Sequence, residues 1–134
     1  MMTGRFRVRC PKCGNVTDIN GNVPCHKCGN PLALAGAEIK LYRMGSPLGV
    51  AIGFGVYIDG QPCGHIANKE TVSYSVPFGT HTVHMTAGMS RKCVDMTVTL
   101  TPQAPIGYLK AHIKPGFISN TVVIESALPQ DMPV

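Results

Sequence analysis

Four cysteines near the start of the chain constrain its fold more than any other feature. They occur in a repeated phrase, Cys-x-x-Cys-Gly-Asn, with the overall spacing C-x2-C-x11-C-x2-C. Two residues between a pair of thiols allow one tight turn to direct both sulfurs at one ion, and a second turn completes a tetrahedron. A segment of about 30 residues also needs such a staple, because it cannot build a sufficient hydrophobic core. The predicted ligands are Cys10, Cys13, Cys25 and Cys28.

The residues around the cysteines also favour a metal site. Gly14 and Gly29 each follow the second cysteine of a pair. A backbone with positive φ at that point can direct amide N–H groups at the thiolates, and glycine adopts this conformation without cost. Between the pairs, Asn20-Gly21 is a strong hairpin signal. We therefore expect two knuckles at neighbouring ends of a small β-ribbon.

The same thiols could instead form disulfides or a redox centre, so the compartment matters. The opening residues, MMTGRFRVRC, contain arginines with no apolar stretch behind them, and this does not fit a secretory signal. No apolar segment approaches the roughly 20 residues of a membrane span. We therefore expect a cytoplasmic protein with no membrane span. In a reducing cytosol structural disulfides are rare, and paired CxxC motifs usually bind metal.

Residues 5–31 resemble a zinc ribbon of the CPxCG…CxxCG kind. This resemblance implies one structural zinc ion per chain, held by the four cysteines. Rubredoxins share the knuckles, but they surround an iron with aromatic residues and have a longer interval between the pairs. Here only Phe6 is aromatic and the interval is polar, so zinc is the better interpretation. Four thiols leave no position for His26, and we expect neither a fifth ligand nor a catalytic zinc.

The formal net charge of +5 is concentrated in the first thirty residues, which hold five basic residues and one acidic residue. A basic ribbon can contact nucleic acid. Zinc with four thiolates carries two net negative charges, however, and nearby cations offset them. We expect the lysines mainly to balance the thiolates, and the arginines to form a solvated strand face or to contact an acidic protein partner. The candidate contacts for nucleic acid or an acidic partner are Arg5, Arg7, Arg9, Lys12 and Lys27.

After residue 36 the chain alternates apolar and polar residues with a period of two, in short runs separated by turn signals. This pattern predicts an antiparallel β-sandwich of about eight strands, so the chain as a whole should be mainly β. The clearest inward face consists of Val94, Met96, Val98 and Leu100. The predicted boundaries are 1–36 for the zinc ribbon, 37–128 for the sandwich and 129–134 for a flexible tail.

Part of the sandwich is similar to PEGA-like domains, which are small bacterial β-sandwiches. The rhythm of VYIDGQPCGHIANKETVSYSVPFGTHTVHMTAG carries this resemblance. The matching positions are Asp59, Gly60, Gly64, Gly79 and His81. The resemblance implies an Ig-like sandwich that serves as a non-catalytic interaction module.

Other potential ligands and catalytic groups have simpler explanations. Cys63 and His65 are two residues apart, so they should share a strand face and could chelate a second ion, although cysteine is more often a small buried hydrophobe. His81 and His84 should point to opposite sides of their strand. No Ser-His-Asp arrangement, paired carboxylates or phosphate-binding glycine loop stands out, so we predict that the protein is not an enzyme.

Two functions remain from the sequence. The favoured prediction is a non-catalytic zinc-binding adaptor that interacts with another protein of unknown identity. The alternative is a zinc ribbon that binds nucleic acid, with the sandwich as a dimerisation or regulatory module.

Overall fold

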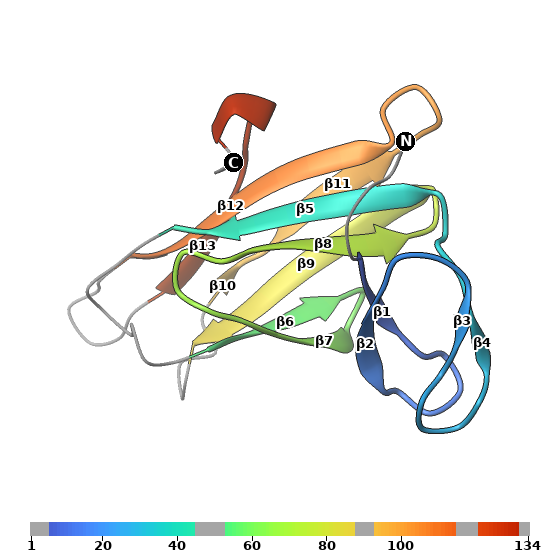
Figure 1. Ribbon diagram of the computed structural model, residues 1–134. Helices are drawn as coiled ribbons and strands as arrows, with labels where there is room; N and C mark the ends of the chain where they lie inside the picture. The colour runs from blue at the N-terminus through green and yellow to red at the C-terminus, as the bar shows by residue number, and fades with distance from the viewer. Residues whose placement is uncertain (1–5, 45–52, 88–92, 115–120, 132–134) are drawn as a thin grey trace.

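The computed structural model describes residues 6–44, 53–87, 93–114 and 121–131. This part of the chain contains thirteen strands, one short 3-10 helix and no α-helix, which confirms the mainly β prediction (Figure 1). The elements are β1 (Phe6–Arg9), β2 (Val16–Ile19), β3 (Val23–Pro24), β4 (Pro31–Leu32), β5 (Ala37–Arg43), β6 (Phe54–Ile58), β7 (Gln61–Ile66), β8 (Thr71–Val76), β9 (Gly79–Ala87), β10 (Cys93–Val94), β11 (Met96–Leu100), β12 (Ile106–Lys114), β13 (Thr121–Ser126) and η1 (Pro129–Asp131).

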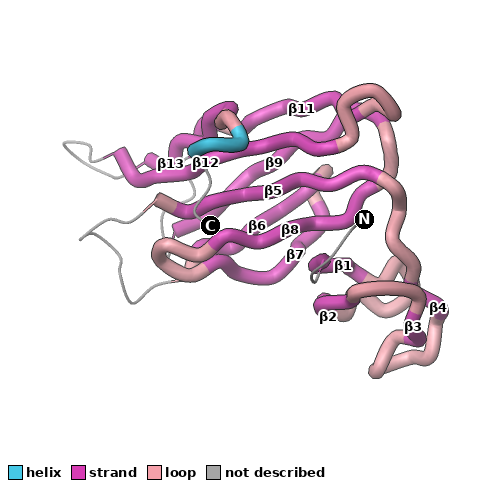
Figure 2. Tube along the Cα trace, turned by 45° about the horizontal axis from the view of Figure 1, so that its top comes forward, coloured by secondary structure: helices cyan, strands magenta, loops and turns pink. Residues whose placement is uncertain are grey.

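Two sheets enclose the main hydrophobic core. One has seven strands in the order β10-β13-β12-β5-β8-β1-β2, and the other has four in the order β11-β9-β6-β7 (Figures 1 and 2). The alternation of the sequence explains which side chains are inside. In β5, Ile39 and Leu41 are buried and Lys40 between them is not; in β9, Val83 and Met85 are buried on either side of His84. We call β5 to β13 the sandwich.

Most neighbouring strands of the sandwich are antiparallel, as predicted. Two pairs are parallel: β5 with β12, and β10 with β13. The first of these pairs places Leu41 beside Leu109 and so joins the beginning of the sandwich to a strand near its end. Such a long-range pairing joins the two halves of the open sheet, but it leaves no local signal in the sequence.

The N-terminal strands extend the larger sheet. Strand β1 pairs antiparallel with β2 and parallel with β8, where Arg7 lies beside Tyr74. Strands β3 and β4 form a separate small sheet, where Val23 pairs with Leu32. We call β1 to β4 and their connections the ribbon. The ribbon therefore lies at one side of the sandwich and shares a sheet with it (Figure 1).

Two expectations about side-chain direction were wrong. Val94 is 53% exposed and does not join the inward face of Val98 and Leu100. The reason is that the chain passes from one sheet to the other at Asp95: β10 belongs to the larger sheet and β11 to the smaller one. Cys93, next to Val94, packs against the core instead.

Cys63 and His65 do not share a strand face. Cys63 is buried and His65 is exposed, because the pairing of β6 with β7 shifts register beside Gly64, whose φ is 82°. A β-bulge of this kind adds a residue and reverses the direction of the side chains that follow. The bulge therefore directs Cys63 and His65, the pair considered for a second ion, to different faces of the strand.

The end of the described chain is partly ordered by hydrogen bonding. Ala127 N–H donates to Tyr108 O at 2.8 Å, and η1 follows within the segment that the sequence assigned to a tail. Among the described residues, no helix is long and apolar enough to span a membrane.

Candidate metal centre

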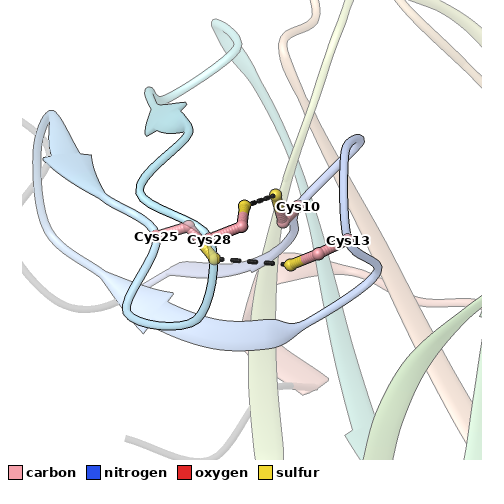
Figure 3. A group of neighbouring side chains, drawn as sticks. All are labelled: Cys10, Cys13, Cys25 and Cys28. Carbon is pink, nitrogen blue, oxygen red and sulfur yellow. Dashed lines mark hydrogen bonds between the residues drawn. The ribbon is translucent and has the colours of Figure 1, made fainter.

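The four cysteines of the repeated phrase come together in the ribbon. Cys10 follows β1, Cys25 follows β3, and each second cysteine lies in the turn after the first. The sulfurs of Cys10 and Cys28 are 3.6 Å apart, as are those of Cys13 and Cys25 (Figure 3). All four sulfurs lie within 4.8 Å of one another. A tetrahedral ion with metal–sulfur bonds of about 2.3 Å separates its sulfurs by about 3.8 Å, so the cluster has the dimensions of a four-thiolate metal site.

The two knuckles have the same backbone structure. In the first, Cys10 N–H donates to Asn15 O at 2.8 Å and Gly14 N–H donates to Cys10 O at 2.9 Å. The second repeats both bonds at 2.8 Å, among Cys25, Gly29 and Asn30. The φ angles of Gly14 and Gly29 are 80° and 78°, as the sequence predicted. A side chain with a Cβ rarely adopts this conformation, so each glycine allows its knuckle to close.

Backbone amides stabilise the negative charge of the first thiol in each knuckle. The N–H groups of Cys28 and Lys27 lie against the sulfur of Cys25 and lower its pKa to about 6, although burial opposes them. The equivalent N–H groups of the first knuckle lower the pKa of Cys10. Cys13 also accepts a backbone N–H, but burial and the neighbouring thiols outweigh this contact and raise its pKa to about 11. A cation at the centre would allow all four thiols to ionise, because thiolates are the metal-binding form.

The metal cluster is also the core of the ribbon. The buried cluster around it consists of Cys10, Ile19, Cys25 and Leu32, so half of this cluster are candidate metal ligands. His26 is exposed and does not belong to the cluster of donors. Four thiols complete a tetrahedral site without it.

The basic residues of the ribbon have different surroundings. Lys12 and Lys27 are exposed at equivalent positions of the two knuckles. Arg7 is not a solvated side chain: it is only 17% exposed, and its Nη1 donates to His65 O at 2.6 Å. Its Nε also donates to Asp18 at 3.5 Å. Arg5 lies outside the described residues. Arg7 therefore links the ribbon to β7 of the sandwich.

A cleft of about 200 Å³ lies where the ribbon meets the sandwich. We call it the junction cleft; it is lined by Arg7, Arg9 and Pro11 of the ribbon and by Ile58, Cys63 and Tyr74 of the sandwich, among others. Arg9 Nε is buried without a hydrogen-bond partner, and the Arg7 guanidinium lies over the ring of Tyr74, 5.9 Å from its centre. Burial raises the pKa of Cys63, whereas the charges of Arg9 and Arg7 lower it, so both guanidinium groups act on this cleft.

The histidines of β9 point to opposite sides, as predicted. His81 is buried, with Nδ1 2.6 Å from Asp59 Oδ2 and Nε2 2.7 Å from Pro77 O. Through His81, these contacts connect the turn at Asp59 with the turn at Pro77, and the PEGA-like resemblance rests partly on these two turns. His84 lies on the other face, where its Nδ1 is 2.7 Å from Asp95 Oδ1.

Sequence reasoning missed a second group of side chains that could bind a metal, formed by His84, Cys93 and Asp95. These residues lie on β9, on β10 and between β10 and β11. Only the pairing of β9 with β11 and the passage between sheets bring them together. The spacing C-x-D was visible, but nothing in the sequence indicated that His84 lies opposite it.

Comparisons of the chain with protein-family models, with curated proteins and with solved structures found no match. The resemblances to zinc ribbons and to PEGA-like domains therefore rest on the residues themselves. The cysteine cluster carries the metal-binding conclusion independently of any relative.

Proposed function

We propose that the protein is a non-catalytic zinc-binding adaptor that holds an acidic segment of another protein in the junction cleft. Zinc is the metal that best suits the donor set, because four cysteine thiolates in two knuckles form its closed structural sites. In this function the ion shapes the ribbon and takes no part in chemistry.

The observation that carries the proposal is the lining of the junction cleft, where the basic side chains of Arg7 and Arg9 meet an apolar wall. Arg9 Nε has no hydrogen-bond partner, and leaving a buried donor unpaired costs about 1–3 kcal/mol, so an acceptor that reaches this guanidinium gains affinity. A carboxylate suits the site because it accepts charge-assisted hydrogen bonds from guanidinium groups. The apolar side of the cleft, including Pro11 and Ile58, fits the carbon atoms of such a side chain.

Nucleic acid is the weaker candidate for the same surface. Arg7 is already engaged with His65 O and Asp18. Few basic side chains of the described ribbon then remain for phosphates, and phosphate contacts dominate nucleic-acid affinity.

The test measures binding of the purified chain to fluorescent Glu-rich peptides and to single- and double-stranded oligonucleotides at physiological salt. We expect saturable peptide binding that Arg9→Gln weakens about tenfold, in line with the loss of one charge-assisted hydrogen bond. Lys27→Gln is the matched control, because this cation is exposed and does not line the cleft. Metal content must stay equal in all three proteins.

Nucleic-acid binding below 1 μM that depends on the arginines would overturn the adaptor proposal, as would Glu-rich peptides that bind both variants equally or not at all. Elemental analysis tests the zinc assignment separately: one zinc per chain supports it, and a red iron chromophore contradicts it.

A further inference from the structure

Three side chains on the sandwich bring three different metal-binding atoms together. His84 lies on β9, Cys93 on β10, and Asp95 at the point where the chain passes between the sheets (Figure 1). His84 Nδ1 and Asp95 Oδ1 are 2.7 Å apart, and the donor atoms of all three residues lie within 4.8 Å of one another. The cluster is on the sandwich and contains none of the ribbon cysteines.

Strand pairing fixes the position of each donor. Met96 pairs with Val83 in the antiparallel β9–β11 ladder, which places the preceding residue, Asp95, beside His84. On the other side of His84, Tyr57 is its registered partner on β6, with ring centroids 5.9 Å apart. The imidazole is thus held between an aromatic ring and a carboxylate.

The thiol of Cys93 is placed by a backbone contact. Met85 N–H donates to Cys93 Sγ at 3.4 Å. Burial and the neighbouring Asp95 carboxylate outweigh this contact and raise the pKa of Cys93 to about 11. Hydrogen bonds to a ligand atom orient it and tune its affinity for the metal.

We propose that His84, Cys93 and Asp95 bind a second divalent transition-metal ion, of which Zn²⁺ is the best match. Imidazole nitrogen, thiolate sulfur and carboxylate oxygen are the three ligand types that zinc takes from proteins. Softer Cu⁺ would favour more sulfur, and Mg²⁺ or Ca²⁺ would require oxygen ligands alone. Binding displaces the thiol proton, and a neutral imidazole that coordinates through one ring nitrogen keeps its proton on the other.

The two proposed metal sites differ in the number of ligands that the protein supplies. The side chains of His84 and Asp95 are 34% and 46% exposed, and three protein ligands leave one tetrahedral position for water or for a donor from another molecule. The second ion would therefore keep one exchangeable coordination position, whereas the four thiols of the ribbon would fill all four positions of its ion. We therefore expect the second site to bind zinc more weakly than the ribbon does and to exchange it faster.

The experiment adds Zn²⁺ to the full chain, purified with its ribbon metal in place and freed of loosely bound ions by mild dialysis. Isothermal titration and elemental analysis after gel filtration count the bound zinc. We expect one further zinc per chain in the wild type. His84→Gln, Asp95→Asn and Cys93→Ala should each weaken this step at least tenfold, because even residues that only orient ligands change metal affinity by about 10–100-fold.

His65→Gln is the matched control, since His65 is an exposed histidine outside the cluster. It should bind the added zinc as the wild type does. Retention of ribbon metal and of the β-type circular dichroism spectrum confirms that each variant is folded. If Cys93→Ala disturbs the core, the two exposed substitutions carry the result, because a surface His–Asp pair contributes at most about 1 kcal/mol to stability.

A wild type that takes up no added zinc would overturn the proposal. Equal uptake by the wild type, His84→Gln and Asp95→Asn would overturn it as well, because the zinc would then bind elsewhere. Cobalt provides a second readout: Co²⁺ at this site should give a thiolate-to-metal absorption band that Cys93→Ala removes.

Discussion

The ribbon and the sandwich are both built from β-strands, but they are held together in different ways. The sandwich buries large apolar side chains between two sheets, among them Ile39, Phe54 and Met85. The ribbon buries little, and half of its buried cluster consists of thiols, Cys10 and Cys25. In the ribbon a bound metal ion would take the place of a larger core, because so short a segment cannot remove enough apolar surface from water.

The comparison also shows how one region depends on the other. Strand β1 adds to the edge of the larger sheet, and Arg7 reaches across to His65 O. The sandwich thus positions the ribbon, while a metal bound by the four cysteines would fix the internal shape of the ribbon. Loss of the metal should change the junction cleft and leave the sandwich folded.

Replacement of a ribbon ligand should have the largest effect. In Cys25→Ser, metal content should fall from one ion per chain to near zero, and the ribbon should unfold while the sandwich persists. Metal binding contributes roughly 10–16 kcal/mol to structural sites of this kind, far more than the ribbon core can supply. Elemental analysis and amide NMR spectra measure the two effects. Cys63→Ala, which removes a buried thiol of the sandwich, should keep the metal; a Cys25→Ser protein with full metal and an ordered ribbon would contradict the comparison.

Core truncation tests the opposite region. Phe54 is 1% exposed, and the Arg43 guanidinium lies 3.6 Å from the centre of its ring. Phe54→Ala should lower the free energy of unfolding by about 3–5 kcal/mol, because it removes buried area and leaves a cavity. Phe78→Ala is the control: Phe78 is 45% exposed and its ring packs beside Gly36, so its loss should cost only about 1 kcal/mol. Chemical denaturation measures both, and metal content should be unchanged in both variants.

The same contrast explains which features the sequence revealed. The cysteine cluster depends on local turns, so two CxxCG phrases were enough to predict that the four thiols come together and that Gly14 and Gly29 have positive φ. For the sandwich, the alternation of apolar and polar residues was enough to predict the fold class. Arg43 shows the limit: it is 1% exposed on a strand whose pattern gives no sign of a buried cation.

Features that depend on pairing between distant strands were not predictable. The bulge beside Gly64 separated Cys63 from His65, and the passage between sheets at Asp95 turned Val94 outward. A single shift of register reverses every side chain that follows it. The cluster around His84 was missed for the same reason, since its residues meet only after the sheets have formed.

Removal of the whole ribbon should have a smaller effect on the sandwich than the loss of Phe54. A fragment of residues 37–134 should keep a cooperative thermal transition and β-type circular dichroism. It loses the pairing of β1 with β8 and the hydrogen bond from Arg7 to His65 O. We expect the free energy of unfolding to fall by about 1–2 kcal/mol, which lowers Tm by several degrees. An unfolded fragment would show that the ribbon is part of the core and that the boundary near Ala37 is wrong.

The smallest expected effect is electrostatic and belongs to the sandwich alone. Burial raises the pKa of Asp59, but the hydrogen bonds with His81 and with Thr82 N–H outweigh it and leave the pKa below its usual value. A carboxylate whose pKa is lowered by folding stabilises the fold above its unfolded pKa, about 3.9, and loses this contribution as the pH falls through the folded value. The free energy of unfolding should therefore fall as the solution is acidified below about pH 5.

Asp59→Asn should flatten this acid dependence by at most about 1 kcal/mol, because the carboxylate is 49% exposed and screened by solvent. Asparagine also tolerates the φ of 53° and can still accept Thr82 N–H. Asp59→Ala loses both features and should be less stable than Asp59→Asn by a margin that does not change with pH. Denaturation at pH 3 to 7 separates the two contributions, and metal content measured at pH 7 should be the same in both variants. An acid dependence that Asp59→Asn leaves unchanged would show that other carboxylates govern it.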